Sequence, residues 1–407
     1  MKFPHSVAFG LSLLALSCAA MAADTYAPTP DPLQGDGRVS AFYHWEQAIP
    51  ATPGRLLRSE PLEQTLSLPG AASQLRILYS STDGIDGKTP IAVSGALFIP
   101  QGKAPAGGWP VVTWGHGTVG VADICAPSWS GRSYRDVQYL ARWLNEGYAI
   151  VATDYQGLGV PGGHPLLNNR MAAYGILDAA RAVVSGVPGL ANKVLVVGQS
   201  QGGAGAFASA AYAPTYAPDL GLKGSVGTGV IYTVGASNVG EQDPNKVDAS
   251  LAYGFYTLLA AQQYDPSIDP RDFYTDKALP LFEQARTTCL ASLTADVIGT
   301  GLTPANTRKA NDGAQLKPWL AQVSYPTLKL AQPIFIGTGA EDKTPAAVTQ
   351  VSLMKDACAA GSVVEGHLYK GLGHSETVNA SLKDSLPFAR KVFSDQPVTP
   401  ICNPSVQ

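Results

Sequence analysis

The chain has 407 residues, of which 45% are apolar and only 14% are Asp, Glu, Lys or Arg, against a usual charged share of about 25%. This composition excludes intrinsic disorder and supplies enough apolar residues for a large buried core. The net charge of −3, spread without a block of like charge, argues against a nucleic-acid-binding protein, because such proteins normally present a basic face.

The first residues, 1–22, have the form of a secretory signal. A single charge, Lys2, precedes the apolar stretch 7–20, and small residues end the segment at Ala22. We expect cleavage after Ala22 and a soluble mature protein that is secreted or periplasmic, with no stable membrane insertion. A membrane anchor is one alternative, but the stretch is shorter than the ~20 residues of a spanning helix. A lipoprotein attached through Cys18 is the other alternative.

Strands and helices alternate along most of the remaining chain. Residues 24–60 are rich in Pro, Ala and polar residues and indicate an extended N-terminal segment. The predicted strands are 74–81, 91–99, 109–114, 148–153, 193–197, 224–232, 334–337 and 363–369. The predicted helices are 134–146, 170–184, 201–211, 251–263 and 279–293. Short apolar strands that alternate with helices indicate an α/β fold with a mostly parallel sheet flanked by helices.

The alternation breaks between residues 236 and 325, where the patterns are mainly helical. The simplest organisation is one α/β core, built from 23–235 and 326–407, with a helical insertion at 236–325. Such an insertion is expected to lie over the carboxyl edge of the sheet, where open α/β folds bind their ligands.

The most informative stretch is a Gly-x-Ser-x-Gly motif centred on Ser200. The apolar strand 193–197 leads directly into it, and the helix 201–211 of small residues follows. This strand–turn–helix context is typical of a nucleophile elbow, in which a strained turn exposes the serine hydroxyl. The alternative is a plain strand–helix turn. We expect Ser200 to be a catalytic nucleophile.

A serine nucleophile needs a base and an orienting carboxylate, which follow it in the order acid, then histidine, in this kind of fold. Only His367 and His374 follow Ser200. His367 lies within a predicted strand and is expected to be a sheet-face residue, whereas His374 follows that strand and is the predicted base. Asp342, just past the preceding strand, is the predicted acid, with Glu341 in reserve.

The oxyanion formed in such a reaction needs two backbone N–H donors. One is expected from Gln201, the residue after the nucleophile. The other is expected from the loop that follows strand 109–114, at Gly117 or Thr118. His116 precedes Ser200 in the chain, so we expect it to shape this loop rather than to act as the base.

The cysteine count indicates disulfides rather than a metal site. Four cysteines remain after the predicted cleavage: Cys125, Cys289, Cys358 and Cys402. An even number in an exported chain suggests two disulfides, and four cysteines allow three pairings. No Cys/His cluster has the spacing of metal ligands, so no metal is expected.

Taken together, these motifs resemble the secretory lipase family of α/β-hydrolases. The matching pieces occur in order over roughly residues 75–380, and the ordered set is more specific than the elbow alone. They are WGHGT at 114–118, CAPS at 125–128, DYQGLG at 154–159, LD at 177–178 with RA at 181–182, GQSQGG at 198–203, Asp342, and GH at 373–374.

The resemblance implies an α/β-hydrolase fold and hydrolysis of carboxylic esters through an acyl-enzyme, without a cofactor. It also implies a helical cap inserted between the elbow and the catalytic acid. Cys125 would pair with Cys289, tying a core loop to the cap, and Cys358 with Cys402, tying a late helix to the tail.

The expected substrate is a small-molecule, lipid or polymer ester. Aromatic and leucine side chains of the insertion suggest an apolar pocket, although packing of the cap itself is the favoured explanation for them. A serine peptidase of the same fold is one alternative, but it normally carries a propeller domain for which too few residues precede the core. A non-catalytic hydrolase-like binding protein is the other; it predicts a broken triad, whereas all three candidates stand in order here.

Overall fold

The computed structural model describes residue 1 and residues 39–233 and 243–407. The predicted signal segment, apart from Met1, and the predicted start of the insertion at residue 236 lie outside the described residues. Within the described ranges, no helix is both long and apolar enough to cross a membrane.

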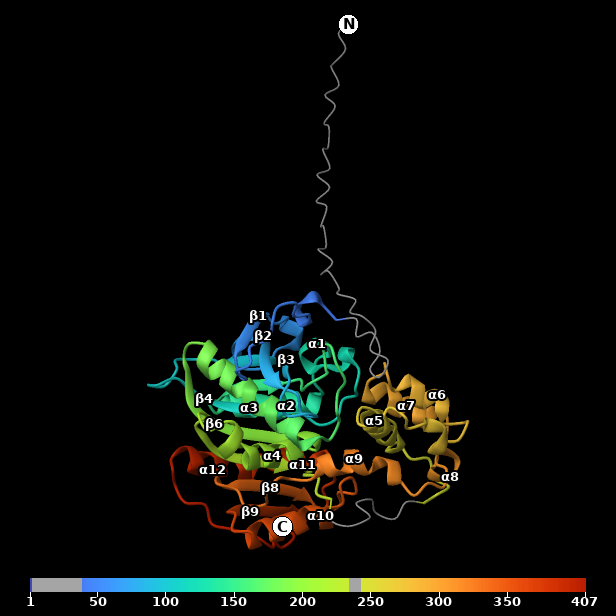
Figure 1. The fold of residues 1–407 in the computed structure, drawn as a ribbon. Coiled ribbons are helices and arrows are strands. Elements are labelled where there is room, and N and C mark those ends of the chain that lie inside the picture. Colours follow the sequence, from blue (N-terminus) through green and yellow to red (C-terminus); the bar gives the residue numbers. More distant parts are fainter. Residues whose placement is uncertain (2–38, 234–242) are drawn as a thin grey trace.

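A nine-stranded sheet in the order β1-β2-β3-β5-β4-β6-β7-β8-β9 forms the centre of the structure (Figure 1). The pairs β1–β2, β2–β3 and β3–β5 are antiparallel, and all pairs from β5 to β9 are parallel. The predicted mostly parallel sheet is therefore confirmed. The strands are β1 (Leu56–Pro61), β2 (Ala71–Thr82), β3 (Pro90–Pro100), β4 (Trp109–Gly115), β5 (Ala149–Thr153), β6 (Leu190–Gln199), β7 (Leu222–Thr228), β8 (Ile334–Gly339) and β9 (Val364–Tyr369).

Helices cover both faces of this sheet. On one face α2 and α12 pack against the strands, and on the other α3, α4 and α10 do so. Along β6, Leu195 and Val197 pack against the helices on the first face, and Val194 and Val196 pack against those on the second. Because both faces of the strand are buried, its apolar residues are consecutive rather than alternating with polar ones. The helices are α1 (Pro127–Ser130), α2 (Tyr134–Asn145), α3 (Asn169–Gly186), α4 (Gln201–Tyr216), α5 (Leu251–Gln262), α6 (Leu279–Gln284), α7 (Leu290–Gly299), α8 (Pro304–Thr307), α9 (Lys317–Leu320), α10 (Ala347–Ala359), α11 (Glu376–Ala380) and α12 (Leu382–Phe393).

Some predicted boundaries are wrong. The single helix predicted at 279–293 is two helices, α6 and α7, because Cys289 adopts an extended conformation and caps the start of α7. The strand predicted to run to residue 232 ends at Thr228, since Gly229 turns the chain with φ +59°. β1, most of which lies inside the predicted extended segment 24–60, and α12 were not predicted.

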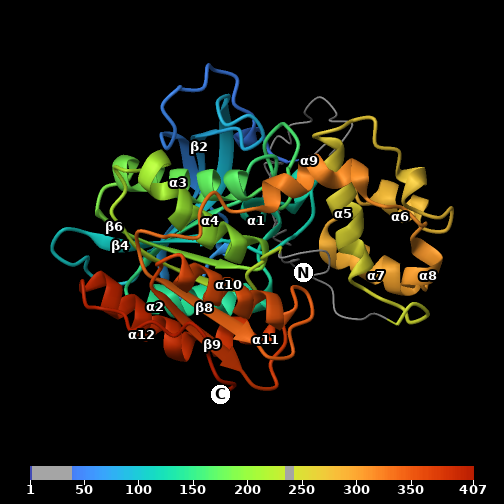
Figure 2. The same ribbon diagram turned by 60° about the horizontal axis from the view of Figure 1, so that its bottom comes forward.

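The helices α5–α9 form a group of their own beside the sheet (Figures 1 and 2). Their apolar side chains share one buried cluster, separate from the clusters of the sheet. Members of this cluster include Phe255, Tyr256, Leu259, Phe282 and Leu293. Most of the aromatic residues of the insertion therefore stabilise the helical group itself, the second of the two roles considered from the sequence.

Candidate active site

All of the predicted site residues follow the carboxyl ends of parallel strands. Gly117 and Thr118 follow β4, Ser200 follows β6, Asp342 follows β8 and His374 follows β9. Since parallel strands end at the same edge of a sheet, this topology gathers residues far apart in the sequence at one place.

The elbow at Ser200 is a sharp turn directly between β6 and α4. Ser200 has φ +59° and ψ −118°, a conformation that is strained for a residue with a side chain. Its backbone N–H donates to the carbonyl of Thr228 at 2.8 Å, which ties the turn to β7. A Cβ on Gly202 would lie 1.9 Å from the carbonyl oxygen of Gly115, so only glycine allows α4 to start this close to β4.

His374 and Asp342 form a hydrogen-bonded pair. Nδ1 of His374 donates to Oδ2 of Asp342 at 2.8 Å, and the carboxylate is buried with 5% exposure. The ring lies against Gly229, where a Cβ would come within 2.5 Å of the imidazole Cε1. Because Nδ1 carries the proton toward the carboxylate, Nε2 bears the lone pair and is the acceptor nitrogen of the ring.

The Asp342 carboxylate is held by more than the histidine. The Thr344 backbone N–H donates to Oδ1 at 3.0 Å, and Nε2 of Gln350 donates to Oδ2 at 2.9 Å. Gln350 is fully buried on α10, and its own carbonyl oxygen accepts from the Thr338 hydroxyl at 3.0 Å. Gln350 could not be identified from the sequence, because a glutamine inside a helical pattern has no distinguishing mark.

The alternatives for base and acid lie elsewhere. His367 sits on β9, stacked on Phe335 at 5.0 Å between ring centroids, and pairs with Glu365 at 3.5 Å. Burial works against the charged imidazole, but the Glu365 hydrogen bond and the Asp384 charge outweigh burial and raise the pKa of His367. Glu341 is exposed, and no hydrogen bond joins it to His374.

The predicted oxyanion loop lies against the elbow. A Cβ on Gly117 would be 3.4 Å from Cβ of Ser200, so the loop backbone reaches the nucleophile closely. His116 Nδ1 donates to the Gly117 carbonyl at 2.7 Å, and the Tyr155 hydroxyl donates to the His116 carbonyl at 3.0 Å. Burial lowers the pKa of His116. His116 thus shapes the loop and does not face the elbow as a base.

A hydrogen-bonded chain that the sequence did not predict ties the loop to α4. His164 Nδ1 donates to the carbonyl of Gln156 at 2.7 Å, so its Nε2 accepts from Nε2 of Gln201 at 3.1 Å. The Gln201 carbonyl oxygen then accepts from the Thr118 hydroxyl at 3.2 Å. Burial lowers the pKa of His164 to about 4, so the ring is neutral at pH 7 and this arrangement is fixed.

A cleft of about 850 Å³ opens over these residues. Gly117, Ser200 and His374 line this cleft, and so do Tyr253 of α5 and Leu290 of α7. Residues with polar side chains form much of the rest of the lining, although apolar atoms contribute most of its exposed surface. The polar lining comprises Thr118, Ser130, Arg132, Ser133, Arg135, Gln138, Thr294, Ser375, Glu376 and Asn379. In the described part of the chain, no cluster of His, Cys, Asp or Glu has the arrangement of a metal site.

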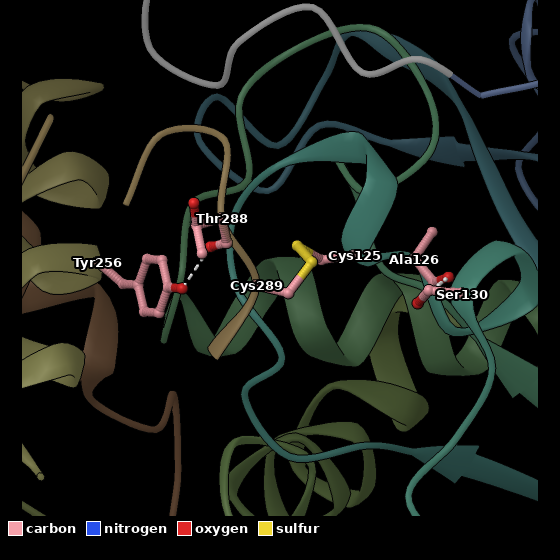
Figure 3. Close-up of a disulfide and its surroundings, with 6 residues drawn as sticks. All are labelled: Cys125, Ala126, Ser130, Tyr256, Thr288 and Cys289. Carbon is pink, nitrogen blue, oxygen red and sulfur yellow. Dashed lines mark hydrogen bonds between the residues drawn. A yellow bond between two sulfur atoms is a disulfide. The ribbon is translucent and has the colours of Figure 1, made fainter. Parts of the chain in front are cut away.

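A disulfide joins the loop after β4 to the start of α7 in the helical group (Figure 3), and both of its cysteines line the cleft. Cys125 pairs with Cys289 across a sequence separation of 164, and the Tyr256 hydroxyl fixes the adjoining carbonyl of Thr288 at 2.6 Å. A second disulfide joins Cys358 to Cys402 with a separation of 44. Both pairings are those that the family resemblance implies.

Replacing both Cys125 and Cys289 by serine is expected to lower the free energy of unfolding by about 2–4 kcal/mol, because the bond closes a long loop. Since both cysteines line the cleft, we also expect slower ester hydrolysis by the folded variant. Urea denaturation followed by circular dichroism, with initial rates without urea, measures both. The matched double variant at Cys358 and Cys402, which do not line the cleft, should lose stability only. Equal effects of the two pairs on rate would contradict this expectation.

Comparison with known proteins agrees with this architecture. No curated protein matches the chain significantly. Candida antarctica lipase A in its closed state superposes with a TM-score of 0.67 at 19% identity, over 87% of this chain and 86% of that one. A mutant of the rice cell wall degrading esterase LipA from Xanthomonas oryzae gives 0.65 at 20% identity, over 83% and 100%.

These similarities establish the α/β-hydrolase fold. The family model described as secretory lipase matches residues 133–399, which is more than half of the chain and includes the elbow, the acid and the histidine. The chain therefore belongs to the secretory lipase family and is a carboxylic-ester hydrolase.

Proposed function

We propose that this protein is a secreted serine esterase in which Ser200, His374 and Asp342 act as a catalytic triad. The observation that carries the proposal is that the strained Ser200 elbow lines the same cleft as His374, which is hydrogen-bonded to Asp342. The two disulfides support an oxidising, extracellular or periplasmic location. Export would be tested by mass spectrometry, which is expected to place the mature N-terminus at Ala23.

The proposed reaction proceeds in two acyl-transfer steps. His374 Nε2 accepts the Ser200 proton as the hydroxyl oxygen attacks the ester carbonyl, and Asp342 stabilises the imidazolium that forms. The Gln201 N–H and the Gly117–Thr118 loop bind the oxyanion. His374 then protonates the leaving alcohol and, in the second step, activates the water that hydrolyses the acyl-enzyme. These side chains and backbone groups supply the proposed chemistry without a cofactor.

We further propose that the segment 236–325 acts as a cap over the sheet edge, with the core formed by 23–235 and 326–407. Tyr253 and Leu290 from this segment line the cleft, and the Cys125–Cys289 disulfide ties the segment to the core. Since apolar atoms make up most of the exposed lining of the cleft, we infer a preference for apolar acyl groups over polar ones.

A panel of p-nitrophenyl esters from acetate to palmitate tests this function. Each methylene that the cleft buries should add about 0.8 kcal/mol, so kcat/KM should rise with acyl length until the chain outgrows the cleft. A fluorophosphonate probe should label Ser200, as mapped by peptide mass spectrometry. Rates that are highest with acetate and fall with each longer acyl chain would contradict the inferred preference. Absence of both ester hydrolysis and labelling would contradict the esterase proposal itself.

A further inference from the structure

Nε2 of His374, the nitrogen that would act as the base, already has a hydrogen-bond partner other than Ser200. Nε2 of His374 lies 2.9 Å from Nε2 of Gln199, the residue directly before Ser200. The carbonyl oxygen of Gln199 accepts from the Arg135 guanidinium at 2.9 Å. Within the ranges that the structure describes, the Ser200 hydroxyl makes no hydrogen bond to the imidazole.

The direction of each hydrogen bond in this chain is fixed by chemistry. Arginine has only donors, so the Gln199 oxygen must face Arg135 and the Gln199 amide nitrogen must face His374. His374 donates from Nδ1 to Asp342, which leaves Nε2 as an acceptor. The Gln199 amide therefore donates to the one lone pair of the imidazole that the proposed mechanism requires for the Ser200 proton.

Contacts around both side chains hold this arrangement in place. Gln199 is buried with 1% exposure, and its oxygen fills the space where a Cβ on Gly117 would lie, at 2.4 Å. Arg135 is anchored by its Nε to Asp136 at 2.8 Å and reaches the Ser375 hydroxyl, next to His374, at 3.3 Å. The guanidinium thus links the residue before the nucleophile to the residue after the base.

We propose that Gln199, held by Arg135, caps Nε2 of His374 in the resting enzyme and so acts as a brake on acylation of Ser200. The proposal rests on the esterase function proposed above. The single in-plane lone pair of His374 Nε2 accepts one hydrogen bond with good geometry. The Gln199 amide must therefore move away before the Ser200 hydroxyl can donate to Nε2. The free energy of that hydrogen bond is then added to the barrier of the first step.

Substitution of Gln199 by methionine tests the brake, since methionine has a similar volume and no donor. We expect kcat/KM for p-nitrophenyl acetate and the rate constant of fluorophosphonate inactivation to rise together, by about 2- to 12-fold. This range is the factor that corresponds to a net hydrogen bond of about 0.5–1.5 kcal/mol. Arg135→Met should accelerate both reactions in the same direction, because it removes the support of the Gln199 amide.

The double variant decides whether the two residues act as one unit. If they do, Gln199→Met with Arg135→Met reacts no faster than Gln199→Met alone. Gln201→Met is the matched control, because this glutamine flanks Ser200 on the other side and contacts His164 and Thr118; it should not accelerate either reaction.

Circular dichroism confirms that each variant is folded before rates are compared. A folded Gln199→Met variant that reacts at or below the wild-type rate overturns the brake, because loss of a purely structural contact slows both reactions. If Gln199→Met does not fold, Arg135→Met on the cleft wall carries the same test. A wild-type enzyme that neither cleaves esters nor labels at Ser200 contradicts the esterase function instead, so the two failures are distinguishable.

Discussion

Replacing Ser200 by alanine is expected to lower kcat for ester hydrolysis by about 10⁶-fold, because no other group in the proposed mechanism can form the acyl-enzyme. His374→Ala should cost about as much, since the serine is a weak nucleophile without its base. The variant that combines Ser200→Ala with His374→Ala should be no slower than either single variant. Such non-additivity, measured with a soluble p-nitrophenyl ester, identifies two residues that act as a unit.

His367→Gln provides the matched control for the histidine. It replaces the only other histidine after Ser200, on β9, where the ring pairs with Glu365 and stacks on Phe335. We expect this variant to keep its activity and to lose some stability at most. Abolished activity in folded His367→Gln, together with an active His374→Ala, would show that the base has been misassigned.

The elbow could be predicted from the sequence because it is local. The features that predict it all fall within about twenty consecutive positions, namely an apolar strand, two glycines around Ser200 and a helix of small residues. The strained turn can therefore be predicted from the residues that form it. The positions of Asp342 and His374 could be predicted because each residue follows an apolar strand. The loops that follow parallel strands all lie at the carboxyl edge of the sheet.

The contacts that surround these residues could not be predicted in the same way. Gln350, Arg135 and His164 lie on other elements, and nothing in their local sequence distinguishes them from surface glutamine, arginine or histidine. Their roles arise from packing between segments up to 240 positions apart, such as Arg135 and Ser375. The break between α6 and α7 could not be predicted from local sequence either. The apolar pattern continues across it, and the break lies at Cys289, whose disulfide partner is distant in the sequence.

Replacing Asp342 by asparagine is expected to lower kcat by about 10⁴-fold with little change in KM, because the imidazolium formed during acyl transfer loses its counter-charge. The carboxylate now accepts from three donors, namely the His374 ring, the Gln350 amide and the Thr344 N–H. An asparagine must turn its NH₂ toward at least one of these donors. It therefore cannot reproduce the network, and thermal unfolding should show a loss of stability as well.

Glu341→Gln is the matched control for Asp342→Asn, because it removes the adjacent, exposed carboxylate that makes no contact with His374. It should leave both kcat and the unfolding temperature close to the wild-type values. Single-turnover acylation measured by stopped flow separates the chemical step from substrate binding in each variant. A larger loss of kcat in Glu341→Gln than in Asp342→Asn would assign the role of the acid to Glu341. The buried network around Gln350 would then hold a carboxylate that is not the catalytic acid.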